Sequence, residues 1–268
     1  GSDALHALGQ LVSEDEGRSV RQVAFVDARG SVATCTGGKA IQAAGWKCGS
    51  GFERIVDLAA AWGKDGPLTS CSEFGVQANL MSNDKVWPAM AKAYEETKGD
   101  LAERMLAALD AAQAVGGDIR GRQSAALIVV KAKSSGKPWE DRIFDLRVDD
   151  HMEPLKELRR LVTLQRAYNH MNAGDLAVEH KDNEAALREY AAAEKLASNA
   201  EGIPASRLAE MTYWHAVALV NMQRVEEALP LFKKVFAMDE NWRTLKVRLP
   251  KSGLLPDDAK LIERIVAK

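Results

Sequence analysis

Residues 116–130, GGDIRGRQSAALIVV, join the end of a helix to a strand and decide the fold of the first half of the chain. Upstream, apolar residues recur at helical spacing after Asp100, a suitable N-cap, so the glycine pair 116–117 is expected to end that helix. Residues 124–130 are almost wholly apolar, which is typical of a strand covered on both faces. Residues 143–148 alternate apolar and charged side chains, so the two segments predict a β-hairpin.

A second hairpin and a second helix are predicted nearer the N-terminus. Residues 23–26 and 31–34 are apolar or β-branched, and they flank a turn-forming segment, Asp27–Gly30. Residues 86–94 predict a shorter helix. Strands and helices together predict an α+β domain, a layered sheet and helix structure, over residues 1–153.

Helical periodicity replaces the strand signals after Pro154 and continues almost to the C-terminus, which predicts an all-α domain over residues 154–268. Two helix-turn-helix units repeat small and aromatic residues at the same spacing. Small residues so placed are expected where two helices approach closely. The matching positions are Gly174, Ala186, Tyr190 and Ala193 in one unit and Ala216, Ala228, Phe232 and Val235 in the other.

This spacing resembles the tetratricopeptide repeat, which implies a surface that binds a peptide or protein partner. The match is partial, because the usual tryptophan position holds His170 in one unit and Thr212 in the other. The offset between the units also exceeds the roughly 34 residues of the ideal repeat. An ordinary helical bundle is therefore the alternative.

Several segments of the first half form an ordered series: Arg21–Val23, Val26–Asp27, Phe74–Leu80, Leu101–Arg104, Gly116–Leu127 and Asp145–His151. In order and spacing they resemble a bacterial family, domain of unknown function 1028, which is placed among the N-terminal-nucleophile (Ntn) hydrolases. The resemblance implies an Ntn-hydrolase-like fold and an amidohydrolase ancestry. It also implies that residues 50–71 are an insertion.

The resemblance further implies that about the first third of the domain is missing, because the family begins with a strand whose first residue would be the nucleophile. Such a nucleophile uses its own α-amine as base, and Ser2, preceded by Gly1, lacks a free amine. The complete parent is thus a candidate amidohydrolase, whereas this chain is expected to show no such turnover.

The loop after the glycine pair and one polar stretch near residue 78 supply the candidate site residues. The loop can present donors to an anion or a carbonyl, or its acid can simply pair with one of its arginines. Side-chain amides in the apolar stretch can line an oxyanion site or close hydrogen bonds within the sheet. The candidate catalytic residues are Asn79, Asp118, Arg120 and Ser124, and the candidate substrate-binding residues are Gln77, Arg122 and Gln123.

Neither a metal nor a cofactor is expected. The three cysteines form no C-x-x-C pair. Cys48 and Cys71 flank the expected insertion. They either form a disulfide in an oxidising compartment or remain buried thiols, and we expect the thiols. Residues 149–151, Asp-Asp-His, offer metal-ligand types, but adjacent side chains rarely converge on one centre.

Composition narrows the function classes further. The chain has 268 residues and a formal net charge of −2, which gives no basic footprint for nucleic acid. No apolar run approaches the roughly 20 residues of a membrane helix. The compartment, cytoplasmic or exported, stays open because any signal would precede Gly1. Missing strands would leave an open sheet edge, so we expect a homodimer. A non-enzymatic binding or scaffolding module is the alternative function.

Overall fold

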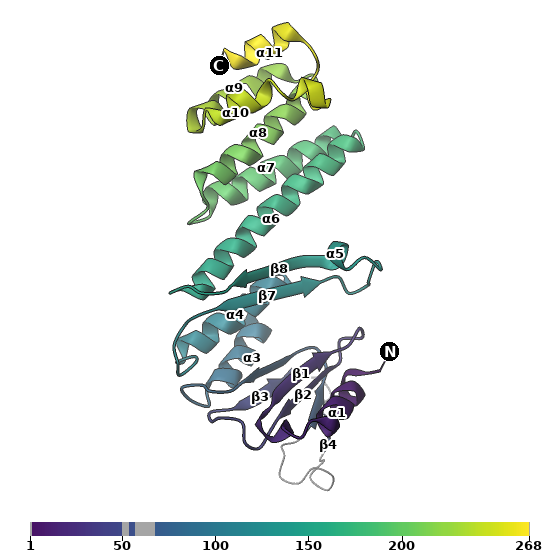
Figure 1. Ribbon diagram of the computed structural model, residues 1–268, viewed down its shortest axis with the longest axis vertical. Helices are drawn as coiled ribbons and strands as arrows, with labels where there is room; N and C mark the ends of the chain where they lie inside the picture. The colour runs from purple at the N-terminus through teal and green to yellow at the C-terminus, as the bar shows by residue number, and fades with distance from the viewer. Residues whose placement is uncertain (1, 50–53, 57–67, 268) are drawn as a thin grey trace. The chain divides into compact units, whose positions relative to one another are not determined.

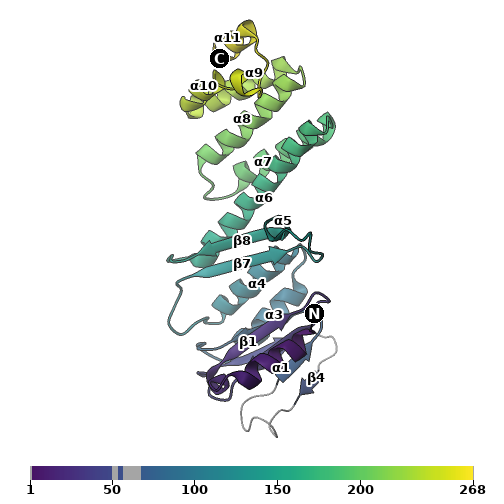
Figure 2. The same cartoon turned by 45° about the vertical axis from the view of Figure 1, so that its right-hand side comes forward.

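The computed structural model describes residues 2–49, 54–56 and 68–267. The chain divides into two compact units, residues 1–158 and 159–268. The first mixes strands with helices and the second is helical (Figures 1 and 2). Most of the insertion expected at residues 50–71 lies outside the described residues.

In its described residues, the first unit contains three small antiparallel sheets and the helices that pack on them. One sheet has the strand order β1-β2-β5-β4, and the other two pair β3 with β6 and β7 with β8. The helices are α1 (Ala4–Glu14), η1 (Arg18–Val20), α3 (Val86–Glu96), α4 (Leu101–Ala114) and α5 (Pro138–Asp141). The strands are β1 (Gln22–Val26), β2 (Val32–Thr36), β3 (Gly45–Cys48), β4 (Arg54–Val56), β5 (Leu68–Cys71), β6 (Gly75–Ala78), β7 (Ala125–Val130) and β8 (Arg142–Val148).

The first predicted hairpin is confirmed as β1 and β2, whose register pairs Val26 with Val32. Its turn is held by Asp27, whose Oδ1 accepts from the backbone N–H groups of Arg29 at 2.8 Å and Ser31 at 3.0 Å. Gly30 has a φ of +81°, a conformation that favours glycine. The Asp27 side chain and Gly30 therefore define the turn, and the turn sets the register of the β1–β2 hairpin.

The N-terminal helix α1 covers the sheet and was not predicted from the sequence. Asp3 caps it by accepting from the N–H of His6 at 2.8 Å. Its buried face joins apolar residues of β2 and β5 in one core. Figure 2 shows α1 lying beside β1 of the same sheet. The members of this core are Ala4, Leu8, Val12, Ala33, Cys35 and Leu68.

The segment around residues 116–130 has the predicted secondary structure but not the predicted burial. Asp100 caps α4 by accepting from the N–H of Glu103 at 2.9 Å, and β7 pairs with β8 as a hairpin. However, Ile128 and Val130 are 50% and 55% exposed, whereas alternate residues of β7 are buried. The expectation that both faces of this strand are covered is wrong, because only one face packs against helix.

A disulfide joins Cys48 at the end of β3 to Cys71 at the end of β5. The expectation of two thiols is therefore wrong. The bond connects the ends of β3 and β5, and β5 itself lies within residues 50–71, the segment expected to be an insertion. Cys35 is buried and lies outside this disulfide.

The second unit consists of helices whose pairing follows the small residues. These are α6 (Pro154–Glu179, which begins in the first unit), α7 (Asn183–Asn199), α8 (Ala205–Asn221), α9 (Val225–Met238), α10 (Asn241–Lys246), η2 (Pro250–Ser252) and α11 (Ala259–Val266). Ala186 and Ala228 are fully buried, as their spacing predicts. A Cβ added at Gly174 would lie 3.0 Å from the Tyr190 ring, so that contact needs the smallest residue. Within the described ranges, no helix is long and apolar enough to cross a membrane.

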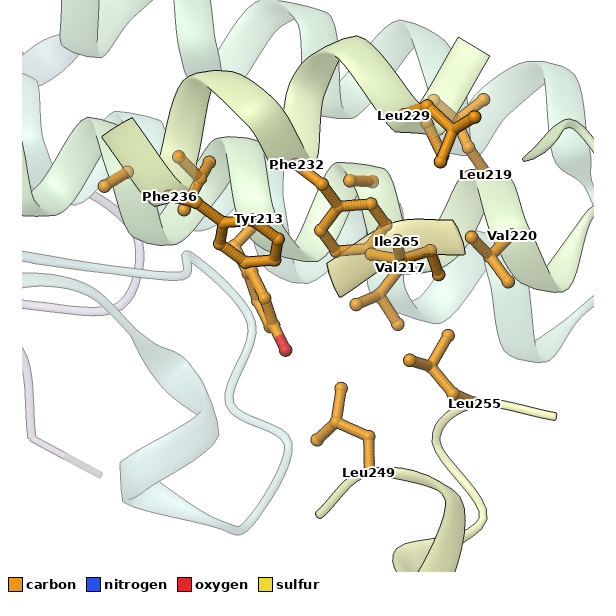
Figure 3. Packing of buried hydrophobic residues seen from close by; sticks show 14 residues of the cluster. Tyr213, Val217, Leu219, Val220, Leu229, Phe232, Phe236, Leu249, Leu255 and Ile265 are labelled. Carbon is orange, nitrogen blue, oxygen red and sulfur yellow. The ribbon is translucent and has the colours of Figure 1, made fainter. Parts of the chain in front are cut away.

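The largest core of this unit surrounds Tyr213 and Phe232, with Val217, Leu249 and Ile265 around them (Figure 3). The Tyr213 and Phe232 rings meet edge to face with centroids 5.7 Å apart. Burial raises the pKa of the Tyr213 hydroxyl well above its ordinary value of 10. Because this core contains residues of α8, α9 and the C-terminal segment, it holds these elements together.

Lys246 of α10 is a buried charged residue in this unit. Its side chain is fully buried, and Nζ donates to the backbone oxygen of Ile262 at 2.8 Å. Burial, followed by the positive charge of Arg243, lowers the pKa of Lys246 from 10.5 to about 8. The folded state therefore disfavours the protonated amine.

We expect Lys246→Met to raise the free energy of unfolding at pH 7 by about 1–2 kcal/mol, because it removes a buried ammonium. Between pH 8 and 10.5 the unfolded chain binds a proton that the folded chain has lost, so the stability of the original protein rises with pH in this interval. The advantage of the variant should therefore shrink towards pH 10.5. Urea denaturation at several pH values measures it.

The exposed Lys251→Met serves as the control and should change the stability little at any pH. An advantage of Lys246→Met that is the same at pH 7 and pH 10 would contradict the depressed pKa.

Candidate functional site

A pocket with a volume of about 760 Å³ lies within the first unit, between the loops that follow β6, α4 and β8. Met90 of α3 and Leu109 of α4 supply an apolar part of its lining. All the candidate site residues named from the sequence line this one pocket. They are Gln77, Asn79, Asp118, Arg120, Arg122, Gln123 and Ser124.

The amide side of the pocket is built around Gln22, the first residue of β1. Its Oε1 accepts from Asn79 Nδ2 at 2.9 Å. Its Nε2 lies within hydrogen-bond distance of the backbone oxygens of Gly45 (3.2 Å) and Ala78 (3.0 Å) and of the Thr36 hydroxyl (3.0 Å). One side chain thus ties β1 to the β3–β6 pair and fixes the orientation of the Asn79 amide.

Gln77 is fixed from the neighbouring strand. The Thr34 hydroxyl donates to Gln77 Oε1 at 2.6 Å. In the part of the chain that the structure describes, Gln77 Nε2 and Asn79 Oδ1 make no hydrogen bond of their own. The wall therefore offers one oriented donor and one oriented acceptor, which is the complement of an amide group.

Backbone bonds hold the loop after β6 against the loop after α4. The N–H of Ile119 donates to Leu80 O at 3.0 Å, and the N–H of Ser82 donates to Gly117 O at 2.9 Å. Gly116 has a φ of +122°, and a Cβ there would lie 2.1 Å from Ser82 Oγ. Glycine at this position thus permits the close approach that places Asn79 and Asp118 around one pocket.

The other side of the pocket carries paired charges. Asp118 Oδ1 accepts from Arg120 Nε at 3.0 Å and Oδ2 accepts from Nη2 at 2.7 Å, and Arg122 pairs with Glu153. The Arg120 guanidinium holds the pKa of the Asp118 carboxyl below its usual range. Asp118 therefore stays ionised and orients Arg120, an arrangement unsuited to proton donation at neutral pH.

Ser124 lies exposed at the rim, and within the described ranges its hydroxyl makes no hydrogen bond to a base. Among the residues that the structure describes, no histidine, lysine or cysteine lines the pocket. A serine nucleophile needs an activating base, and the described residues place none in hydrogen-bond contact with Ser124. Among those residues, no group of three His, Cys, Asp or Glu side chains is placed to hold a metal ion.

A family model described as "Family of unknown function (DUF1028)" matches residues 1–56 and 64–158, more than half of the chain. The chain belongs to this family. The crystal structure of protein SPO2555 from Silicibacter pomeroyi, which carries the same DUF1028 description, is 26% identical with a TM-score of 0.43. The match covers 60% of this chain and 57% of that chain, so the chain spans little more than half of that relative. No curated protein matches it.

Every residue that lines the pocket falls within the two DUF1028 segments. The sequence identified the arginine loop, Gln77 of β6 and Asn79, which follows β6. It missed Gln22, which binds Asn79, and Glu153, which pairs with Arg122. A polar residue at the start of an apolar strand was the available signal for Gln22. Its partners lie far along the chain, so only the fold shows what it binds.

Proposed function

We propose that the pocket of the first unit binds a small ligand that carries both an amide and a carboxylate, such as an N-acyl amino acid. The observation that supports this most is a pair of polar atoms, Gln77 Nε2 and Asn79 Oδ1, that have no hydrogen-bond partner among the described residues. Thr34 holds the first side chain and Gln22 holds the second. A secondary amide presents an oxygen and an N–H that match this donor and acceptor.

The arginine loop supplies the charge for the carboxylate. Arg120 and Arg122 line the same pocket, and each already has one carboxylate partner in the protein. Guanidinium groups carry five N–H donors, so donors remain for a ligand carboxylate after these pairs form. Met90 and Leu109 offer apolar contact to an acyl chain.

Two finer hypotheses from the sequence complete this proposal. The Ntn-hydrolase-like ancestry of the DUF1028 unit makes an amide the natural ligand class, because enzymes of that kind cleave amide bonds. The tetratricopeptide-like spacing of the second unit makes its helices a surface for a peptide or protein partner. The rival is a non-enzymatic scaffold whose pocket holds no small molecule.

Isothermal titration calorimetry with N-hexanoylglycine, and with its neutral analogue N-hexanoylglycinamide, tests the proposal. We expect the acid to bind at least about tenfold more tightly than the amide, because only the acid pairs with the arginines. Arg120→Met should weaken binding of the acid by about three- to tenfold. Arg147→Met removes an equally exposed arginine on β8 that does not line the pocket, and it should leave binding unchanged.

Equal affinity for acid and amide, or no heat at millimolar ligand, would contradict the proposal and favour the scaffold. Release of glycine distinguishes binding from hydrolysis, and we expect none beyond background. Release that persists through purification and disappears in Asn79→Ala or Ser124→Ala would instead make the chain an amidohydrolase.

A further inference from the structure

The helical unit contains a second cavity, separate from the pocket of the first unit, with a volume of about 340 Å³. Side chains of α6, α7 and α8 and Leu254, which follows η2, line it. Its apolar lining includes Met171, Val178 and Val217. A hollow of this size and composition is within the range that holds small ligands or single side chains.

One end of the cavity is acidic. Asp175 and Glu179, one helical turn apart on α6, both line it, and none of the lining residues that the structure describes is basic. Within the described chain, neither carboxylate forms an ion pair, and the only hydrogen bond to them comes from the Tyr190 hydroxyl to Asp175 Oδ1 at 2.6 Å. The negative charge at this end is therefore uncompensated.

Asp175 and Glu179 are both exposed to solvent, although neighbouring side chains remove part of the water around Asp175. Partial burial, helped by the nearby negative charge of Glu179, raises the pKa of Asp175 despite the hydrogen bond from Tyr190. A cation placed between the two carboxylates would remove this repulsion and restore the favourable interaction lost on burial.

An aromatic side chain completes the lining. Trp214 of α8 lies in the cavity wall, half-buried, with its ring edge to face against Tyr213 at a centroid distance of 5.5 Å. Indole is the best natural partner for a cation, and guanidinium and ammonium groups both stack on it. Apolar walls beside carboxylates and an indole suit a long aliphatic side chain that ends in a positive charge.

We propose that this cavity binds the protonated lysine or arginine side chain of a partner peptide. The aliphatic stem would contact Met171, Val178 and Val217, and the charged end would lie between Asp175 and Glu179. This inference specifies the partner chemistry of the helical unit, and so it rests on the proposal that this unit binds a partner. It is independent of the pocket in the first unit.

Fluorescence anisotropy with the full chain and dye-labelled capped alanine pentapeptides tests this. The central residue is lysine, arginine, norleucine or glutamate. We expect the lysine and arginine peptides to bind at least about tenfold more tightly than the norleucine peptide, and the glutamate peptide to bind most weakly. Raising the salt concentration should weaken the two cationic peptides, because it screens the charge pairing.

Variants then locate the site. Asp175→Asn and Glu179→Gln should each weaken the lysine peptide by about three- to tenfold, with unchanged circular dichroism. Glu263→Gln, which removes an exposed carboxylate of α11 outside the cavity, should leave the affinity unchanged. Trp214→Phe should retain more affinity than Trp214→Ala.

Three outcomes would overturn the inference. Equal affinity for norleucine and lysine peptides would leave partner binding intact but remove the cationic site. Weakening by Glu263→Gln as large as that by Glu179→Gln would show diffuse charge attraction instead of a cavity. Binding of none of the four peptides at millimolar concentration would reject partner binding by the helical unit as well.

Discussion

Phe232→Ala should lower the free energy of unfolding of the helical unit by about 3–5 kcal/mol, the largest stability effect that we expect in this protein. Phe232 is fully buried in α9, edge to face with Tyr213 and 5.8 Å from the Phe236 ring (Figure 3). Removal of the ring leaves a cavity among residues of α8, α9 and α11 that cannot collapse without moving helices. Urea denaturation followed by far-ultraviolet circular dichroism measures the loss.

A matched pair of variants shows whether the loss comes from this core. Phe232→Leu keeps most of the apolar volume and should cost clearly less than the alanine variant. Leu176→Ala truncates a side chain of α6 that is 54% exposed, and it should cost within about 0.5 kcal/mol. Similar losses for Phe232→Ala and Leu176→Ala would mean that Phe232 is not at the centre of the core.

Elements whose signals are local were predictable from the sequence. The turn at Asp27, the cap at Asp100 and the glycine pair 116–117 each act within a few residues of themselves, and the structure places an element boundary at each. The buried alanines of the helical unit were predictable for a related reason. Helix geometry relates positions along one element, so a repeated spacing of small residues marks the contact face.

Features that depend on distant partners were not predictable in the same way. The alternation of exposure along β7 depends on what covers each face, and its apolar sequence says only that either face tolerates burial. The Cys48–Cys71 bond depends on two strand ends meeting, which the spacing of the cysteines does not reveal.

The helix α1 is an exception of another kind, because it was missed although its cap and apolar face are local signals.

The convergence of the candidate residues is an intermediate case. Residue type alone identified Gln77 of β6, Asn79 after it and the charged loop after α4, because polar groups in or beside apolar strands are candidates for a functional role. That they line one pocket follows from backbone pairing between residues 80–82 and 117–119, which no local pattern encodes. The fold therefore supplies the proximity, and the sequence supplies the chemistry.

Gln22→Leu tests whether the fold brings the pocket residues together through this side chain. We expect it to lower the free energy of unfolding of the first unit by about 2–4 kcal/mol. Leucine is similar in size but leaves Asn79 Nδ2 without its acceptor and removes the Gln22 donor from the oxygens of Gly45 and Ala78. Unsatisfied polar groups of this kind cost about 1–3 kcal/mol each when buried, and these are half-buried. Chemical denaturation measures the loss, and ligand calorimetry should show weaker binding at the pocket.

If Gln22 positions the Asn79 side chain, a second result is expected that stabilisation of the sheet alone would not produce. Gln22 and Asn79 bond across 57 residues of sequence, so the effects of Gln22→Leu and Asn79→Ala on N-hexanoylglycine affinity should overlap. The loss of binding free energy in the double variant should then be smaller than the sum of the two single losses, by about 1 kcal/mol. Gln10→Leu, on the exposed face of α1, is the control and should alter neither stability nor affinity. Strict additivity of the two pocket variants would mean that Gln22 supports the sheet without orienting Asn79.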